Sequence, residues 1–246
     1  MTALLALTRN ELRLLTREPL ALFWGMGFPV VLLVVFGLIP GFREVSPELG
    51  GSTLLAVYLP VIVVLSMSFL AVTGLPTVVA TYRERLILKR LATTPVGAPR
   101  LLGAQALQSV VVTGAMAAAL LAIGRLAFGV PLPAQLFGWV LTLLLLAASL
   151  LAIGMFVAAV SPTGKVANAL GALLFFPLMF FAGLWIPLQL MPPMLQRIAE
   201  LTPLGAGVQA LQQAAAGSWP ELWQLGVLVG YAAAFAVLAA VLFRWE

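Results

Sequence analysis

The sequence contains no cysteine, no histidine and no aspartate, and all eight of its acidic residues are glutamates. Without cysteine and histidine the chain lacks the usual zinc ligands, a thiol nucleophile and the base of a Ser-His-Asp triad. Without aspartate it also lacks the side chain that usually holds Mg²⁺ in nucleotide hydrolases. We therefore expect a protein with no catalytic residues and no metal or cofactor of its own.

Charged residues are also scarce. They make up 9% of the 246 residues, whereas 63% are hydrophobic and the mean hydropathy is +1.12. A soluble domain has about 25% charged residues, so one soluble core cannot hold this much apolar surface. The chain is predicted to be an all-α integral membrane protein with one domain over residues 1–246. Six apolar segments reach the roughly 20 residues that a transmembrane helix needs, namely 20–39, 54–79, 101–124, 136–160, 166–186 and 222–243.

The distribution of lysine and arginine predicts which way these segments cross. With the N-terminus in the cytoplasm, ten of the 13 basic residues fall inside, and three, Arg43, Arg125 and Arg197, fall outside. This excess fits the positive-inside rule and places both termini in the cytoplasm, with the chain in the cytoplasmic membrane. Orientation then explains the net charge of +5, and we expect membrane lipid rather than nucleic acid as a partner.

Residues 4–17, ahead of the first segment, have the pattern of an amphipathic helix. Arg9, Arg13 and Arg17 follow one another at a spacing of four residues, and leucines lie broadly opposite them. Such a helix lies flat on the inner leaflet of a membrane. A simple basic anchor is the alternative interpretation.

The loop between the second and third segments is the most charged part of the chain. Residues 82–91 predict one short cytoplasmic helix with a basic side and an apolar side, and Pro95 ends it. Glu84 falls on the apolar side, where a carboxylate is costly, so we expect it to meet a basic residue. An ordinary positive-inside loop is the alternative. The candidate contact residues are Tyr82, Arg83, Glu84, Arg85, Leu88, Lys89, Arg90, Thr94 and Pro95.

The outer stretch 182–221 is too apolar for a free loop and too rich in proline for a membrane span. Short re-entrant helices that dip into the outer leaflet and pack against protein fit it best, and a passive surface loop is the alternative. We expect Gly183 to supply a close approach or an unusual φ, and Pro187 to end the fifth span. The candidate outer gate consists of Gly183, Pro187, Pro192, Pro193 and Pro203.

Mild polar and aromatic residues within the spans are candidates for lining a pathway. They are Gln105, Gln108, Ser109, Phe176 and Phe180. Hydrogen bonding between helices is the alternative role for the polar ones, and lipid contact is the alternative for the aromatic ones. The small residues Gly114, Ala118, Gly154 and Ala158 favour close helix packing.

In their order along the chain, these stretches resemble the membrane subunit of ABC-2 type ATP-binding-cassette exporters, particularly the daunorubicin-resistance-like drug permeases. The resemblance covers the whole chain. It rests on Arg17-Glu18-Pro19, on Glu84-Arg85 followed by Thr94-Pro95, and on Gly183 to Pro187, Pro192-Pro193 and Thr202-Pro203. The charged loop departs from the family pattern, which continues with Gly-Thr after the glutamate, whereas this chain has Leu86-Ile87-Leu88.

The resemblance implies a permease that moves a hydrophobic or amphipathic compound, drug-like or lipid-like. Two permease chains, identical or homologous, would form the pathway, and two ATPase subunits would bind ATP and Mg²⁺ beneath it. The charged loop would then be the ATPase-coupling helix. The sequence agrees, because Thr163-Gly164-Lys165-Val166 lacks the leading glycine of a phosphate-binding loop and has valine where that loop has a hydroxyl residue after the lysine. A membrane scaffold that transports nothing is the alternative, and an intramembrane enzyme is disfavoured by the missing residue types.

Overall fold

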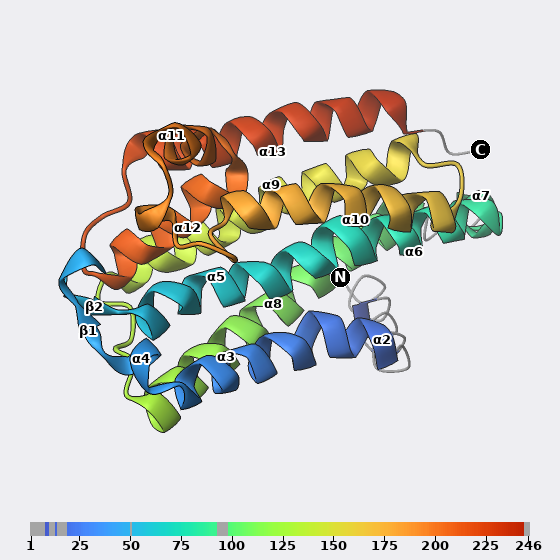
Figure 1. The fold of residues 1–246 in the computed structure, drawn as a ribbon. Coiled ribbons are helices and arrows are strands. Elements are labelled where there is room, and N and C mark those ends of the chain that lie inside the picture. The colour runs from blue at the N-terminus through green and yellow to red at the C-terminus, as the bar shows by residue number, and fades with distance from the viewer. Residues whose placement is uncertain (1–7, 10–12, 14–18, 50, 93–97, 244–246) are drawn as a thin grey trace.

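The computed structural model describes residues 8–9, 13, 19–49, 51–92 and 98–243. Within these residues the chain is mostly helical, and the long helices run side by side along one axis (Figure 1). This arrangement confirms the predicted all-α membrane fold. The amphipathic helix predicted over 4–17 lies almost wholly outside the described residues, and so do Thr94 and Pro95.

The helices vary widely in length. In chain order they are α2 (Pro19–Leu22), the π-helical segment η1 (Phe23–Gly27), α3 (Phe28–Leu38), α4 (Pro40–Arg43), α5 (Leu54–Ser68), the π-helical segment η3 (Phe69–Gly74), α6 (Leu75–Glu84), α7 (Ile87–Ala92), α8 (Ala98–Phe128), α9 (Leu136–Val160), α10 (Gly164–Phe181), α11 (Pro193–Leu201), α12 (Pro203–Ala215) and α13 (Leu222–Leu242). The connections between them contain two 3-10 turns, η2 (Pro47–Leu49) and η4 (Leu188–Leu190). They also contain two antiparallel strands, β1 (Val45–Ser46) and β2 (Ser52–Thr53).

Five helical stretches are long and apolar enough to cross a membrane, namely Leu54–Glu84, Gly103–Phe128, Leu136–Val160, Gly164–Phe181 and Leu222–Leu242. The second predicted segment continues to Glu84 instead of ending at residue 79, and the fifth ends at Phe181 instead of residue 186. The first corresponds to a shorter apolar helix, Phe23–Leu38. Together with α2, which precedes it directly, this helix reaches about 30 Å at about 1.5 Å per residue.

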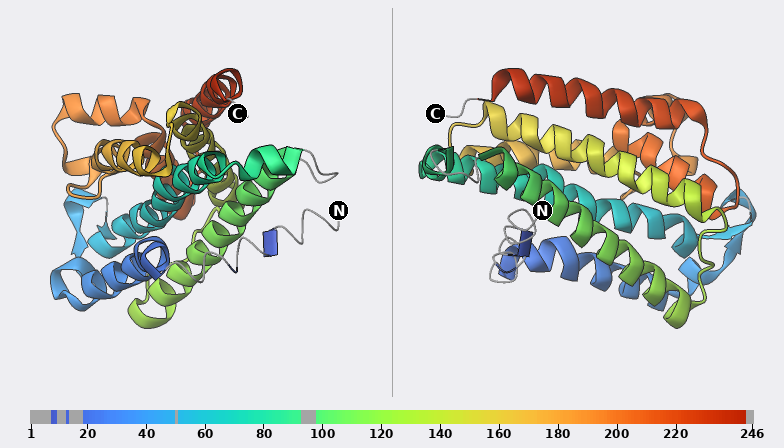
Figure 2. Two further views of the ribbon diagram at one scale, coloured as in Figure 1. Left: turned by 90° about the vertical axis from the view of Figure 1, so that its right-hand side faces the viewer. Right: turned by 180° about the vertical axis from the view of Figure 1, so that it is seen from behind.

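The continuous helix made of α5, η3 and α6, which we call span two, occupies the centre of the bundle. α3 and α8 lie on one side of it, and α9 and α10 lie on the other (Figures 1 and 2). The apolar window of span two is 89% buried, against 28% for α8, 22% for α10 and 11% for α13. The core is therefore built around span two, and the peripheral helices leave apolar faces uncovered within the described part of the chain.

Glycines let two helices approach the middle of span two closely. A Cβ built on Gly171 of α10 would lie 2.5 Å from the carbonyl oxygen of Val72 and 3.0 Å from the Cα of Thr73. Gly154 of α9 faces the carbonyl of Ala71 in the same way. All three contacted residues belong to η3, so the π-helical turn of span two is fixed between α9 and α10 by backbone contact. The close packing predicted for Gly154 is confirmed.

The two ends of the bundle differ in charge. One end, called here the α7 end, holds α2, α7, the α9–α10 turn and the end of α13 (Figure 1). The other, called the hairpin end, holds β1, β2, α4 and α11. Basic side chains that the sequence assigns to the cytoplasm lie on elements of the α7 end, whereas Arg43 and Arg197 lie on α4 and α11 at the hairpin end.

Candidate functional site

The charged loop begins as a direct continuation of span two. α6 includes Glu84, and the chain then turns at Arg85 and Leu86 before α7 starts. The N–H of Arg85 donates to the carbonyl of Thr81 at 3.0 Å, and Leu86 adopts a φ of +57°. The prediction of one helix over 82–91 is therefore wrong. A left-handed residue cannot sit inside a right-handed helix, so Leu86 separates the end of α6 from α7.

Arg83 and Glu84 hold the turn between α9 and α10 from both sides. The guanidinium of Arg83 donates to the carbonyls of Ala159, at 3.4 Å, and of Ser161, at the C-terminal end of α9. A carboxylate oxygen of Glu84 accepts from the N–H of Gly164, the first residue of α10, at 3.1 Å. A cation at a helix C-terminus and an anion at a helix N-terminus are each favourable. We call this pair of contacts the Arg83–Glu84 clamp.

The clamp corrects one expectation from the sequence. Glu84 was predicted to meet a basic side chain, but the partner that the structure gives it is the backbone of Gly164. The side chain of Glu84 is exposed rather than buried on an apolar face. Its carboxylate therefore keeps its contact with solvent and does not need a cation to offset a loss of hydration. Thr81 lies on α6 about one helical turn before Glu84, and its side chain lies against the position that a Cβ of Gly164 would occupy. The end of α6 and the start of α10 are therefore in direct contact.

The remaining candidates of this loop lie around α7. Arg85, Lys89 and Arg90 are exposed at the end of the bundle, and Tyr82 is partly buried on α6. The side chain of Leu88 is outside the described part of the chain, as are Thr94 and Pro95. The exposed cations form a basic surface beside the clamp, suited to an acidic surface of a partner protein.

At the hairpin end, Gly183 ends α10. Its φ is +86°, its N–H donates to the carbonyl of Phe180 at 3.0 Å, and the N–H of Leu184 donates to Met179 at 3.2 Å. This bonding pattern is the Schellman motif, in which the left-handed position is usually glycine. The predicted special φ of Gly183 is confirmed. The prediction that Pro187 ends the fifth span is wrong, because the helix has already ended at Phe181.

The prolines of the candidate gate organise the short helices that follow Gly183. Pro187 precedes η4, Pro192 and Pro193 start α11, and Pro203 starts α12. At the first turn of a helix the missing N–H of proline costs nothing. α12 is largely buried against α9, α13 and α5, so this part of 182–221 is a packed element of the chain and not a passive surface loop.

A chain of glutamine hydrogen bonds ties this outer element to span two. Gln196 of α11 donates to the carbonyl of Gln189 at 3.3 Å, and Gln189 donates to the side chain of Gln212 at 2.8 Å. Gln212 of α12 then donates to the carbonyl of Val57 in α5 at 3.0 Å. Span two therefore has specific polar contacts near both ends, and sequence reasoning missed these glutamines because they lie far apart in the chain.

The candidate pathway residues fall into two separate groups. Gln105, Gln108 and Ser109 lie on α8, whereas Phe176 and Phe180 lie on α10, and span two runs between these helices (Figure 2). The structure therefore does not bring the two groups together within one subunit. Phe176 is 60% exposed and, with Phe180 and Trp185, forms an aromatic surface at the outer half of α10.

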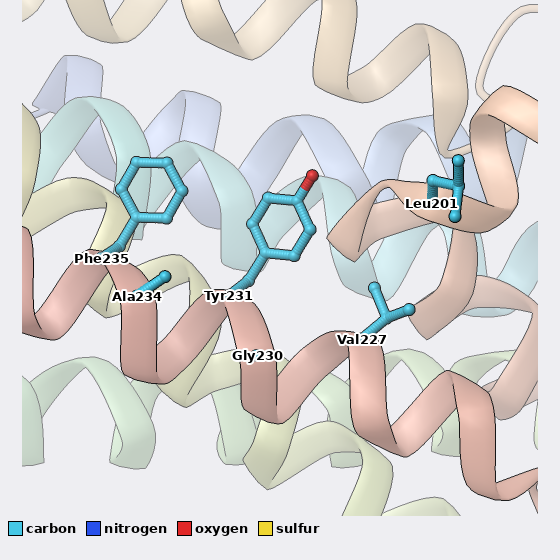
Figure 3. A pocket seen from close by; sticks show the side chains of 6 residues that line it. All are labelled: Leu201, Val227, Gly230, Tyr231, Ala234 and Phe235. Atoms are coloured by element: carbon cyan, nitrogen blue, oxygen red, sulfur yellow. The ribbon is translucent and has the colours of Figure 1, made fainter.

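A shallow apolar groove of about 300 Å³ runs between α11 and α13 (Figure 3). Leu201 lines it from α11, and Tyr231 and Phe235 line it from α13, with their rings stacked 6.0 Å apart. Because α13 is the least buried of the long helices, we interpret this groove as a lipid-facing surface.

Comparison with known proteins fits this architecture. The sequence model of a protein family described as ABC-2 type transporter matches residues 2–215 of the chain. No curated protein matches it.

Proposed function

The chain belongs to the ABC-2 type transporter family, and from that membership we propose that it is the permease subunit of an ATP-driven exporter. Two copies, or one copy and a homologous permease, form the pathway in the cytoplasmic membrane. Two ATPase subunits, which carry ATP and Mg²⁺, bind at the α7 end in the cytoplasm, where both termini also lie. The exported compound is hydrophobic or amphipathic, drug-like or lipid-like.

The position of α7 supports the ATPase contact. The helix follows span two after a two-residue turn and contacts α6 and α8. Together with that turn it presents exposed Arg85, Lys89 and Arg90 at the end of the bundle. A movement of α7 imposed by a partner reaches span two through two residues, Arg85 and Leu86. A membrane scaffold has no use for a charged helix attached to the central helix of its bundle, so this connection favours a transporter.

The Arg83–Glu84 clamp is the observation that carries the coupling part of the proposal. It joins the end of span two to the turn between α9 and α10, so a displacement of α6 pulls both helices with it. The backbone contacts of Gly154 and Gly171 at η3 make the same three helices rigid neighbours in the middle of the bundle. At the hairpin end, Gln212 and Val57 pass the movement on to α12 and to the outer element that we propose as the gate.

The exposed faces of α8 and α10 support a second permease chain and a greasy cargo. Both helices bury less than a third of their apolar window within the subunit. The aromatic surface of Phe176, Phe180 and Trp185 gives the outer half of α10 and the residues after it an apolar face without charge. Such a face suits contact with an apolar compound or with the partner chain.

The test uses the chain purified in complex with its ATPase and reconstituted into liposomes. A hydrophobic dye and a fluorescent phospholipid serve as probes, and we expect ATP to drive the movement of at least one of them. Glu84→Ala should leave the complex assembled and hydrolysing ATP but reduce probe movement about tenfold or more. Glu44→Ala, which removes an exposed glutamate directly after α4 at the opposite end of the bundle, is the matched control and should behave like the wild type.

Two results would contradict the proposal at different levels. If ATP drives neither probe in the wild-type complex and does not change its structure, the chain is a scaffold. If ATP-driven movement occurs but Glu84→Ala equals the wild type, the exporter assignment stands and the clamp is not its coupling element.

A further inference from the structure

Two helices of the chain change from α-helical to π-helical winding at places that touch each other. The first helix, called here span one, consists of α2, η1 and α3 (Pro19–Leu38), and η1 is its π-helical turn. It contacts η3 of span two, and a Cβ built on Gly25 of η1 would lie 2.8 Å from the side chain of Leu70 in η3. Single π-helical turns inside α-helices occur often at functional sites and at kinks.

Pro29 leaves two carbonyls of η1 without their usual helical donors. The N–H of Phe28 donates to the carbonyl of Phe23, five residues earlier. Pro29, the next residue, has no N–H to offer to the carbonyl of Trp24, five residues earlier, or of Gly25, four residues earlier. Because these helical bonds are missing, span one bends more easily at this turn than within α3.

Span two supplies one of the donors that span one lacks. The hydroxyl of Ser66 in α5, only 1% exposed, donates to the carbonyl of Gly25. In membrane helices, serine and threonine hydroxyls commonly satisfy backbone groups that a proline has freed. A hydroxyl proton rotates to suit its acceptor, so this bond can persist while the helix around the acceptor bends.

The two sides of the turn are held differently. α3 packs against α5 and α8, and its Gly37 lies against the ring of Phe128, so this side is fixed. Within the described residues α2 has its main contacts with η1 itself, where Phe23 and Trp24 are 49% and 44% exposed. A Cβ built on Gly27 would meet nothing closer than the ring of Phe23, at 3.5 Å. Packing therefore does not require glycine at this position, where it weakens the helix relative to alanine.

We propose that η1 is a hinge in span one and that Ser66 is its pivot. α3 stays against span two while α2 changes its angle and carries the upstream residue Arg9 with it, and the carbonyl of Gly25 stays bonded to Ser66. η3 is also followed by a proline, Pro76, but it does not bend, because backbone contacts with α9 and α10 hold it. The hinge is a property of one chain and does not depend on the proposed export activity.

The first experiment measures distances between spin labels by double electron–electron resonance on the intact chain in lipid nanodiscs. The chain has no natural cysteine, so labels can be placed at Arg9→Cys and Val111→Cys, two exposed positions on either side of the hinge. Leu38→Cys with Val111→Cys is the control pair, since neither label lies before the hinge. We expect a broad distance distribution for the first pair and a narrow one for the control pair.

Two substitutions stiffen the proposed hinge. Pro29→Ala returns an N–H to the turn, and Gly27→Ala improves its helix propensity; each should narrow the first distribution to about half its width and leave the control pair unchanged. Pro177→Ala, which removes a proline from inside α10, is the matched control and should narrow neither distribution. A first distribution that keeps its width in both Pro29→Ala and Gly27→Ala would overturn the hinge.

A second experiment tests the pivot by thermal unfolding in detergent. Ser66→Ala leaves the carbonyl of Gly25 without its donor and should lower the unfolding temperature by roughly 2–4 °C. In the Pro29→Ala background the returned N–H replaces the hydroxyl, and Ser66→Ala should lower the temperature by less than half as much. Ser68→Ala is the matched control, since that buried hydroxyl has no partner among the described residues, and it should lower the temperature in neither background. Equal losses from Ser66→Ala in both backgrounds would overturn its assignment as the pivot.

Discussion

Replacing Gly171 by alanine tests the tight contact between α10 and the π-helical turn of span two. The added Cβ would lie 2.5 Å from the carbonyl oxygen of Val72, whereas ordinary contact begins at 3.4 Å, so the helices have to separate by about 0.9 Å. The opposing atoms are backbone and cannot rotate away. Overpacking of this kind costs about 1–3 kcal/mol, and we expect the upper part of that range.

Helix propensity works in the opposite direction, because alanine in a helix is better than glycine by about 1 kcal/mol. The matched control is Gly114→Ala in α8, since nothing among the described residues lies within 4 Å of a Cβ there. We expect Gly171→Ala to be about 2 kcal/mol less stable than the wild type. At about 2–4 °C per kcal/mol this lowers the unfolding temperature by roughly 4–8 °C.

The assay is thermal unfolding of each variant in the same detergent at a fixed heating rate, because membrane proteins seldom refold reversibly. Gly114→Ala should unfold at or slightly above the wild-type temperature. If Gly171→Ala is as stable as Gly114→Ala, then η3 is not held between α9 and α10 and the proposed transmission through this contact is refuted.

Three further predictions concern the α6–α7 turn, the outer element and the topology. Leu86→Gly should keep or raise the unfolding temperature, because a positive φ costs a leucine about 1–2 kcal/mol. Leu86→Val should lower the unfolding temperature, and equal unfolding temperatures for the two variants would contradict a strained turn. Gly183→Val should abolish export at matched membrane abundance, because a branched residue at a φ of +86° disrupts the Schellman motif. Gly183→Asn should retain export, and export by both variants would reject the gate. An impermeant thiol reagent applied to intact cells should label a cysteine at Ser218 but not one at Lys165, both exposed positions, and the reverse result would invert the orientation.

The long apolar runs allowed the fold to be predicted, because a bilayer leaves few alternatives to a helix. The segment 136–160 coincides with α9, where both ends are marked by a change in polarity. The boundaries failed where polarity and helix ends do not coincide. Span two continues through charged residues to Glu84, and α10 stops at the left-handed Gly183 while the sequence is still apolar.

The site was predicted only in outline, because its contacts are tertiary. The charged loop was recognised, but nothing in a sequence shows that Glu84 meets the N–H of Gly164, 80 residues away. Glycines show the same limit. Gly154 and Gly114 were both expected to allow close packing, yet only Gly154 meets another helix within the described subunit, and Gly171 was not singled out.

The central claim is that span two and the α9–α10 turn move as one unit during transport. The chain has no natural cysteine, and a Cβ built on Gly164 lies 3.4 Å from the Cβ of Thr81, just below the usual disulfide range of about 3.5–4.5 Å, so a small separation of the two segments suffices for the bond. The double variant Thr81→Cys/Gly164→Cys therefore allows a disulfide to replace the clamp. The decisive measurement is ATP-driven probe movement by the reconstituted complex before and after oxidation. We predict that oxidation leaves movement intact in this variant and restores it when Glu84→Ala is also present. Loss of movement on oxidation, recovered on reduction, would mean that the two segments have to separate during transport and would contradict the account.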